Sequence, residues 1–428
     1  MGSLEEWAEI EGVIVFPCLE RLEIQSCPKL KTWSMGGFAS HHKLSELNII
    51  CCSSLVAIPS IDGQLSLKTL SITDCPELVY LPNGLDTCTS LQDLTIDQCS
   101  NLVEFSGLSI SHPNISIEVL SLNRCDKIKS LPHQLQHLVA LKRLSIHNCN
   151  EVEAFPEWLG DLSSLVSLSI YSCNKLNRIP EECLGRLTHL KRLQMGPFYS
   201  ELEEFPGLTS IHHLHASLEK LELVGWDKLK SLPDQLQHLT ALKELKIDSF
   251  TGVEALPEWL GNLSSLTSLS IRSWNKLKSI PEECLSRLTC LERLWMGPFW
   301  SELEEYPGLS SIHHLHASLQ DLTLQGWDKL KSLPHQLRHL TALQQLTIIR
   351  FNGVETLPEL LGDLSSLRWL RIFFCDNLTH LPSAKAMHHL SNLEYLEIYR
   401  CSKLKERCAE ERGPEWPKIS HIPVKSIW

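Results

Sequence analysis

Apolar and polar positions alternate along almost the whole chain in one repeated phrase, L-x-x-L-x-[I/L]-x-x-[C/W/F]. In one copy, the aliphatic residues Leu144 and Ile146 alternate with Arg143, Ser145 and His147. This period of two predicts a short β-strand with one buried face and one exposed face. The copies follow one another every 23 to 28 residues, most often every 24 or 25, and their first aliphatic residues are Leu19, Leu44, Leu67, Leu91, Ile117, Leu141, Leu165, Leu190, Leu218, Leu242, Leu266, Leu291, Leu319, Leu343, Leu367 and Leu393.

A fixed period of this length is typical of leucine-rich-repeat solenoids, in which each turn packs only on its neighbours. We therefore predict an α/β-type solenoid, a leucine-rich-repeat horseshoe of about 16 turns. Its concave face should carry a parallel β-sheet and its convex face irregular or short helical segments. The [L/I]-P step in the segment that returns to the next strand prevents a strand or helix from continuing there, because proline has no N–H to donate. The expected parts are a partial N-terminal turn at 1–17, the solenoid at 18–405 and a C-terminal tail or cap at 406–428.

One column of the repeat, three residues after the last aliphatic residue of each strand, changes character along the chain. We expect its members to stack inside the solenoid, one per turn. Nine are cysteines, which we interpret as small buried residues rather than as disulfide partners. The seven in the middle predict a stacked aromatic spine rather than a cofactor site. The cysteines are Cys27, Cys52, Cys75, Cys99, Cys125, Cys149, Cys173, Cys375 and Cys401, and the aromatic residues are Phe198, Trp226, Phe250, Trp274, Phe299, Trp327 and Phe351.

Composition and motifs remove several function classes. The net charge of −12 argues against a nucleic-acid partner, because such a partner usually meets a basic face. No apolar run approaches the ~20 residues of a membrane-spanning helix, and the acidic N-terminus lacks the features of a secretory signal. We therefore expect a location in the cytoplasm or the nucleus, without membrane contact. The sequence carries no nucleotide-binding, hydrolase or metal-site motif, so we predict a protein that is not an enzyme and holds no cofactor or metal.

A block of four turns occurs twice, offset by 101 residues, so the chain can be compared with itself. Between 218–265 and 319–366, nine of the ten outward strand positions differ, whereas six of the other 38 positions differ. Drift at exposed sites does not account for this contrast, because the polar outer segment 227–233 is identical at 328–334. We infer that the exposed face of the strands has diversified as a recognition surface, while the scaffold has been kept.

Binding energy in protein interfaces concentrates in Trp, Tyr and Arg. Most strands carry small polar or charged residues at their exposed positions, but the last three turns carry large aromatic and basic residues. We interpret this group as the hot spot for a protein partner; the alternative is that the C-terminal tail folds back over it. Two smaller groups have the same character. The candidate binding residues are Ile349, Arg350, Trp369, Arg371, Phe373, Tyr395, Tyr399 and Arg400 in the last turns, Arg272, Arg293 and Trp295 in a second group, and Arg143, His147 and Tyr171 in a third.

Several phrases carry a family resemblance, namely LPEWLGNL at 256–263, IPEECL at 280–285 and CSKLKERC at 401–408. Together with the L-x-I-x-x-C-x-x-L-x-x-L-P turns, they make the chain resemble the leucine-rich-repeat region of plant nucleotide-binding leucine-rich-repeat (NLR) disease-resistance proteins. The resemblance implies a role in plant innate immunity. In that role the repeats sense a pathogen effector or a guarded host protein, and they restrain an attached nucleotide-binding module.

The phosphate loop of such a module, G-x-x-x-x-G-K-[S/T], does not occur in this sequence. ATP binding is therefore not carried over, and the chain could be a fragment, a truncated paralogue or a stand-alone sensor. Two other functions stay open, a secreted or receptor-type leucine-rich-repeat ectodomain and a generic intracellular scaffold. Plant ectodomains of that type carry N-x-L-x-G-x-I-P turns and paired-cysteine caps, which this sequence lacks.

Overall fold

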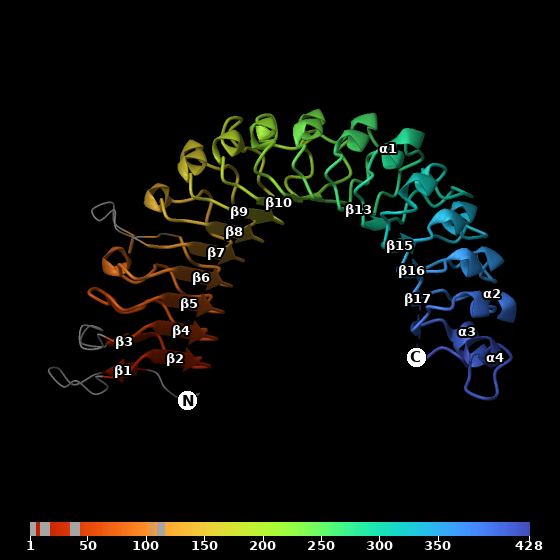
Figure 1. Cartoon of the computed structure of the whole chain (residues 1–428). Helices are drawn as coiled ribbons and strands as arrows, with labels where there is room; N and C mark the ends of the chain where they lie inside the picture. The colour runs from red at the N-terminus through yellow and green to blue at the C-terminus, as the bar shows by residue number, and fades with distance from the viewer. Residues whose placement is uncertain (1–5, 9–17, 35–42, 104, 106, 109–115) are drawn as a thin grey trace. The chain divides into compact units, whose positions relative to one another are not determined.

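The computed structural model describes residues 6–8, 18–34, 43–103, 105, 107–108 and 116–428. The chain divides into two compact units, an N-terminal unit (Met1–Leu218) and a C-terminal unit (Glu219–Trp428). In each unit a layer of strands lies on one side and short helical segments lie on the other (Figure 1). The leucine-rich-repeat solenoid predicted from the repeat is confirmed within each unit.

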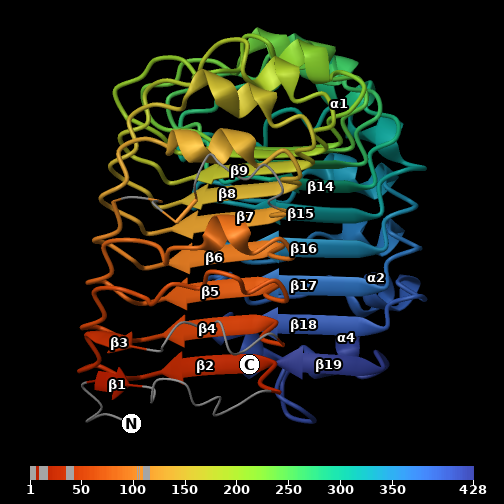
Figure 2. The same cartoon turned by 90° about the vertical axis from the view of Figure 1, so that its left-hand side faces the viewer.

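The strands of the N-terminal unit pair in parallel and in the order of the sequence (Figure 2). In the pairs from β2 to β10, aliphatic residues of the buried face lie beside each other in register, as Leu144 lies beside Leu168. A slip of one residue would turn this apolar set towards solvent, so the hydrophobic pattern fixes the register. A separate parallel pair joins β1 (Glu6–Ala8) to β3 (Thr32–Ser34). The other strands are β2 (Arg21–Gln25), β4 (Glu46–Ile50), β5 (Thr69–Thr73), β6 (Asp93–Asp97), β7 (Val119–Asn123), β8 (Arg143–His147), β9 (Ser167–Tyr171) and β10 (Arg192–Gly196), and the 3-10 helices are η2 (Leu85–Thr87), η3 (His133–His137), η4 (Glu157–Asp161), η5 (Leu184–Arg186) and η6 (Ile211–Leu214).

The C-terminal unit repeats this arrangement, again with parallel pairing between successive strands. Its return segments are mostly single turns of 3-10 helix that begin just after the proline of the [L/I]-P step. The strands are β11 (Lys220–Val224), β12 (Glu244–Asp248), β13 (Ser268–Arg272), β14 (Arg293–Met296), β15 (Asp321–Gln325), β16 (Gln345–Ile349), β17 (Trp369–Phe373), β18 (Tyr395–Tyr399) and β19 (Val424–Ile427). The helices are η7 (Asp234–His238), η8 (Glu258–Asn262), α1 (Glu282–Ser286), η9 (Ile312–Leu315), η10 (His335–His339), η11 (Glu359–Asp363), α2 (Ala384–His389), α3 (Ser402–Arg407) and α4 (Trp416–Ile419).

Most strands are followed by a residue with a left-handed backbone, which turns the chain into the core. Ser249, Arg350 and Phe374 take φ angles of 60°, 55° and 54°. Residues other than glycine rarely adopt positive φ, so the surroundings must hold them there. The N–H of such a residue donates to the last strand carbonyl of the next turn, as Arg350 does to Phe373 at 2.9 Å. The buried residue that follows, Phe351 in this turn, anchors the chain in the core.

The predicted burial of the cysteine column is confirmed. All nine column cysteines are buried, and their thiols are free. The thiol of Cys149 lies 3.8 Å from the carbonyl oxygen of Leu122 in the preceding turn and 3.4 Å from that of His147 in its own strand. Burial raises the pKa of Cys99 and of Cys173 to about 12. These two thiols therefore stay protonated near neutral pH and act as packing groups with a weak donor.

The aromatic members of the column take over the role of the cysteines in the C-terminal unit. The indole N–H of Trp274 donates to the carbonyl of Ile247 at 3.2 Å, which is the position in the preceding turn that a column cysteine also contacts. The rings of Phe250 and Trp274 stack with their centroids 5.1 Å apart, and those of Phe299 and Trp327 lie 6.2 Å apart. These contacts bear out the predicted aromatic spine at these turns.

The C-terminal tail ends as a strand that the repeat phrase did not predict. Strand β19 pairs in parallel with β18, so that Val424 lies beside Tyr395 and Ile427 beside Ile398. The tail thus extends the sheet sideways and does not fold back over its exposed face. Helix α3 begins at Ser402, ahead of the expected boundary at 406. At the other end of the chain, residues 1–5 and 9–17 of the expected partial turn lie outside the described residues.

A buried carboxylate joins the tail to the last complete turns. Glu415 is 2% exposed. It accepts hydrogen bonds from the Leu381 N–H at 2.9 Å and from the Lys418 ammonium at 2.6 Å, and the Arg407 guanidinium lies 3.5 Å away. Burial works against ionisation, but these donors outweigh it and lower the pKa of Glu415.

We expect Glu415→Gln to loosen the attachment of the tail by about 2 kcal/mol, because hydrogen bonds to a charged group contribute roughly that much. Hydrogen exchange of the Leu381 amide and of the β19 amides measures this change. A carboxylate with a lowered pKa stabilises the folded state above the unfolded pKa of about 4.3, and this contribution is lost as the pH falls through the lower folded pKa. The difference between the two proteins should therefore shrink on acidification. Glu410→Gln, at an exposed position of the same tail, should leave the exchange unchanged; equal protection in all three proteins would contradict the prediction.

Candidate protein-recognition surface

The outward side chains of the C-terminal unit form three rows, because the strands pair without a shift in register. We call them the first, middle and last rows, in the order in which a strand reaches them. Across β11 to β19, the first row is Lys220, Glu244, Ser268, Arg293, Asp321, Gln345, Trp369, Tyr395 and Val424, and the middle row is Glu222, Lys246, Ser270, Trp295, Thr323, Thr347, Arg371, Glu397 and Ser426. The last row includes Val224, Asp248, Arg272, Gln325, Ile349, Phe373 and Tyr399.

Two of the predicted hot-spot residues form a stacked pair in the first row. The rings of Trp369 and Tyr395 lie 3.8 Å apart at an angle of 10°. The guanidinium of Arg371 lies 5.0 Å from the Trp369 ring centre, and it is held there by the Glu397 carboxylate at 3.5 Å and the Gln345 amide oxygen at 3.4 Å. All five side chains are half-buried. The pair is therefore fixed before any partner arrives, which lowers the entropy lost on binding.

A second part of the same group lies at the ends of the last strands. Arg350, Phe374 and Arg400 follow β16, β17 and β18 and share left-handed backbones. Their side chains meet, with the guanidiniums of Arg350 and Arg400 at 5.7 and 5.6 Å from the Phe374 ring centre. Tyr399 packs edge-on against Phe374 at 5.6 Å and against Phe373 at 6.2 Å. We call Arg350, Phe374 and Arg400 the arginine–phenylalanine column. Arg350 and Arg400 are among the candidate binding residues predicted from the sequence, and the structure shows that both contact the ring of Phe374.

The second predicted group lines a hollow of about 280 Å³ on the face of β13, β14 and β15. The guanidinium of Arg272 lies 5.2 Å from the Trp295 ring centre and 3.0 Å from the Asp248 carboxylate. Trp295 lies in the middle row between the hydroxyl residues Ser270 and Thr323, both of which it helps to bury. Arg293 also lines this hollow, so the structure brings this group together as predicted.

Charge at the edge of this hollow is balanced. Asp321 pairs in register with Arg293 and lines the hollow. Burial raises the pKa of Asp321, and the positive charges of Arg371 and Arg293 oppose that rise. The hollow therefore presents both signs of charge around the indole ring of Trp295, rather than a single basic pocket.

The third predicted group, in the N-terminal unit, is brought together only in part. His147 and Tyr171 are neighbours across β8 and β9, with ring centres 6.2 Å apart. The His147 Nε2 lies 2.7 Å from the hydroxyl of Ser169, and that hydroxyl donates to the Gln194 amide oxygen at 2.8 Å. Arg143 begins the strand that His147 ends, which separates them by about 13 Å. Arg143 is therefore not part of this group. It lies on the same strand as His147, but at the opposite end of that strand.

The changes between the two copies of the repeated block map onto this face. The nine changed outward positions are at the surface or half-buried in the earlier copy. The one that is unchanged, Gly225 and its counterpart Gly326, is buried. A Cβ atom at Gly225 would lie 2.7 Å from the ring of Phe250, and one at Gly326 would lie 2.7 Å from the ring of Phe351. The sequence had counted this position as outward; the structure shows that it supports the aromatic column instead.

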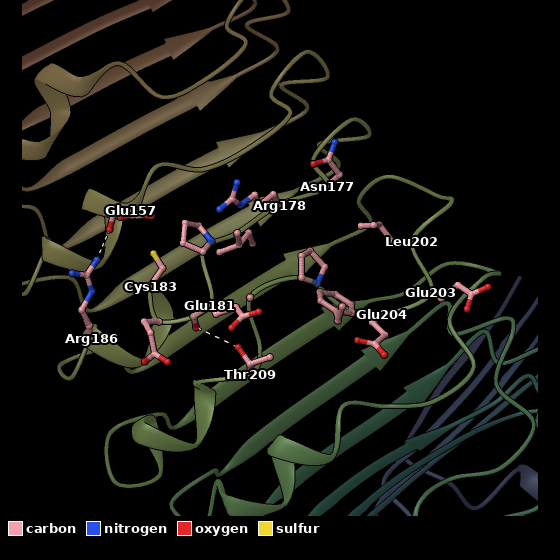
Figure 3. Close-up of a pocket in the computed structure, with 16 residues that line it drawn as sticks. Glu157, Asn177, Arg178, Glu181, Cys183, Arg186, Leu202, Glu203, Glu204 and Thr209 are labelled. Carbon is pink, nitrogen blue, oxygen red and sulfur yellow. Dashed lines mark hydrogen bonds between the residues drawn. The ribbon is translucent and has the colours of Figure 1, made fainter.

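A hollow that the sequence did not predict lies in the N-terminal unit beside η4, with a volume of about 850 Å³ (Figure 3). Arg186 crosses its rim, where it donates to the Asp161 carboxylate at 2.9 Å and to the carbonyl of Glu157. Burial raises the pKa of Cys183 in its wall to about 11, so this thiol is not a ready nucleophile near neutral pH. The only signal in the sequence was the unusually long 28-residue turn after Leu190. The acidic residues Glu181, Glu182, Glu203 and Glu204 also line this hollow.

Neither a membrane span nor a metal site emerges from the described parts of the chain. No helix there is long and apolar enough to cross a membrane. No group of three or more His, Cys, Asp or Glu side chains in those parts is arranged to hold a metal ion.

Comparison with known proteins gives two sequence matches. A family model described as R13L1/DRL21 leucine-rich repeats matches residues 234–298. The putative disease resistance protein At3g14460 of Arabidopsis thaliana is 35% identical over 115 residues, which make up 26% of this chain and 8% of that protein. The chain thus spans a small part of the length of this relative. These matches and the observed fold identify a leucine-rich-repeat module of the protein-interaction type, similar in part to a plant disease resistance protein.

Two solved structures align with most of the chain at low sequence identity. A leucine-rich-repeat protein from Leptospira interrogans is 18% identical and covers 98% of this chain and 99% of its own, with a TM-score of 0.49. An internalin from Listeria monocytogenes is 15% identical and covers 88% of this chain and 86% of its own, with a TM-score of 0.41.

We predict that His147 titrates below the usual histidine pKa of about 6.5, because burial lowers its pKa. Tyr171→Ala should raise the pKa of His147 by admitting water beside the ring. Arg143→Gln should leave it unchanged, because Arg143 is about 13 Å away. NMR titration of the His147 ring protons measures all three proteins. A clear rise in Arg143→Gln would show that Arg143 belongs to the group after all.

Proposed function

We propose that this chain is the recognition module of a plant immune receptor of the NLR type. In this proposal it senses a pathogen effector or a guarded host protein, in the cytoplasm or the nucleus, through the exposed face of its parallel sheet. The partial match to a putative disease resistance protein supports the immune role, and the repeat phrases quoted above support the receptor type. The family resemblance also implies an attached nucleotide-binding module that these repeats restrain, and this module is part of the proposal as well.

The observation that carries the proposal is where the two copies of the block differ. Six of the nine changed positions on the face of the strands are charged in the earlier copy and neutral or apolar in the later one, as Lys246 and Thr347 or Asp248 and Ile349 are. Asp227, which is more exposed and lies on the outer side, is unchanged at Asp328. Exposure alone therefore does not explain the changes. Selection for different contacts on a shared scaffold explains the changes. Such selection requires a partner that touches the strands.

The last turns offer the strongest contacts on this face. Buried aromatic and arginine side chains supply most of the binding energy in interfaces, and clustered exposed rings are unusual on a protein that nothing covers. The stacked pair of Trp369 and Tyr395 is half-buried, and the tail lies beside it at β19 rather than over it. We propose this pair as the centre of the protein interface, with Arg371, Phe373 and Ile349 around it.

We expect Trp369→Ala to reduce capture of the partner about tenfold or more, as is usual for a tryptophan at the centre of an interface. The measurement is quantitative mass spectrometry of proteins that the purified chain retains from infected and uninfected plant tissue. Thermal melting of each variant checks that the fold is kept.

Trp259→Leu provides a matched control. Trp259 lies in η8, away from the strand face, and the later copy of the block carries Leu360 at the same place. This variant should retain the same proteins as the unchanged chain. Equal retention of every protein by Trp369→Ala and Trp259→Leu would contradict the proposed interface.

A further inference from the structure

We propose that the arginine–phenylalanine column binds an acidic segment of a partner protein, with Arg350 and Arg400 each receiving an aspartate or glutamate carboxylate. This inference rests on the proposed recognition function and names the chemistry of the partner. It concerns the ends of the last strands, next to the stacked pair of Trp369 and Tyr395 but not within it.

Most basic residues on this face already have an acidic partner in a neighbouring turn. The shortest distances from the cation to the carboxylate are 2.7 Å for Lys220 and Glu244, and 3.0 Å for Arg272 and Asp248. Arg371 has Glu397 at 3.5 Å. Pairs of this kind neutralise each other and leave little charge for a partner. The face therefore carries few positive groups that are free to bind.

Arg350 and Arg400 are different. Both are exposed, and no carboxylate in the described part of the chain lies within 4.0 Å of either guanidinium. Each contacts an aromatic ring instead, Phe374 in both cases and also Tyr399 at 5.5 Å for Arg400. Stacking leaves the N–H groups at the edge of a guanidinium available, and these form the planar fork that matches a carboxylate.

The backbone sets the spacing of the two guanidiniums. Arg350, Phe374 and Arg400 occupy the same position in three successive turns, with φ angles of 55°, 54° and 52°. Adjacent parallel strands lie about 4.8 Å apart, so the two arginines are two strand spacings apart, about 10 Å. The Phe374 ring lies between them and holds both. The geometry suits two carboxylates on one segment at about that separation.

The neighbourhood favours a polypeptide as the carrier of these carboxylates. Arg350 lines a hollow of about 470 Å³ whose wall includes Pro298, Gly326 and Trp327. Two carboxylates also line it, and both are engaged: Glu302 pairs with Lys329 at 2.7 Å, and Asp328 accepts a hydrogen bond from Asn352 at 3.2 Å. An apolar side chain of the same segment can enter this hollow while the carboxylates meet the arginines. The net charge of the chain is −12, so long-range attraction of an extended polyanion such as RNA is weak, and only a local contact gains from the column.

The earlier copy of the block has the same backbone without the column. The positions 101 residues before Arg350 and Phe374 are Ser249 and Ser273, which have φ angles of 60° each. Serine is thus compatible with the same backbone. Arg350→Ser restores a residue that this repeat already accommodates, which makes it a substitution with little expected effect on folding.

The test is selection of peptides from a random dodecamer display library by the full chain and by Arg350→Ser/Arg400→Ser. The unchanged chain should enrich peptides with two or more Asp or Glu residues, and the double variant should lose this enrichment. Arg350→Lys/Arg400→Lys should keep only part of it, because lysine keeps the charge without the fork. A labelled peptide from the selection should then bind the double variant at least tenfold more weakly by fluorescence anisotropy.

Three outcomes would overturn the inference. They are enrichment of peptides without acidic residues, an acidic enrichment that the double variant retains, and no enrichment by the unchanged chain. A labelled single-stranded RNA and a phosphotyrosine version of the peptide are measured in the same assay. Tighter binding of either than of the Asp- or Glu-containing peptide would assign the column to another ligand. Trp369→Ala tests the wider recognition function separately, so failure of the peptide experiment would not by itself contradict that function.

Discussion

Every turn of this chain depends on its neighbours for burial and for hydrogen bonding, and this dependence shapes everything else in the structure. A single strand of five residues cannot bury its own aliphatic side chains. Parallel stacking covers them, as Leu144 and Leu168 cover each other, and the backbone groups of the strands bond to the strands of adjacent turns. The outward side chains contribute to neither task. They can change from turn to turn at little cost in stability, and for this reason one scaffold can carry many different surfaces.

The sequence was sufficient to predict the strands, their register and the buried column, because these follow from a pattern that repeats every turn. It could not predict β19, since Val424–Ile427 lacks the repeat phrase and pairs with a strand that lies 29 residues earlier. It grouped Arg350 with Arg400, but only the structure shows that the ring of Phe374 lies against both guanidiniums. It counted Gly225 as outward, since only the structure shows the ring of Phe250 where a side chain would be. Each miss involves a contact between turns rather than a pattern within one.

The candidate surface gains its order from the same contacts between turns. Trp369 and Tyr395 stack because identical positions of adjacent strands lie about 4.8 Å apart, close to the separation that stacked rings require. Arg371 is fixed by one acceptor on either side, Gln345 and Glu397, again from adjacent turns. Aromatic and arginine side chains that are already held lose less conformational entropy on binding than mobile ones. The parallel sheet thus supplies pre-organisation that an isolated patch of the same residues would lack.

The candidate surface lies near the end of the solenoid, so its geometry depends on the tail. Terminal repeats have a neighbour on one side only, so they open more easily than central ones. Here β19 supplies the missing neighbour of β18, and the carbonyl of Trp428 accepts a hydrogen bond from the Arg400 N–H at 3.3 Å. Glu415 anchors the segment that leads to β19. The tail therefore holds β18, and with it Tyr395 and Arg400, in the geometry that the stacked pair and the arginine–phenylalanine column require. A substitution in the tail, away from the candidate surface, would therefore weaken the proposed binding by loosening β18.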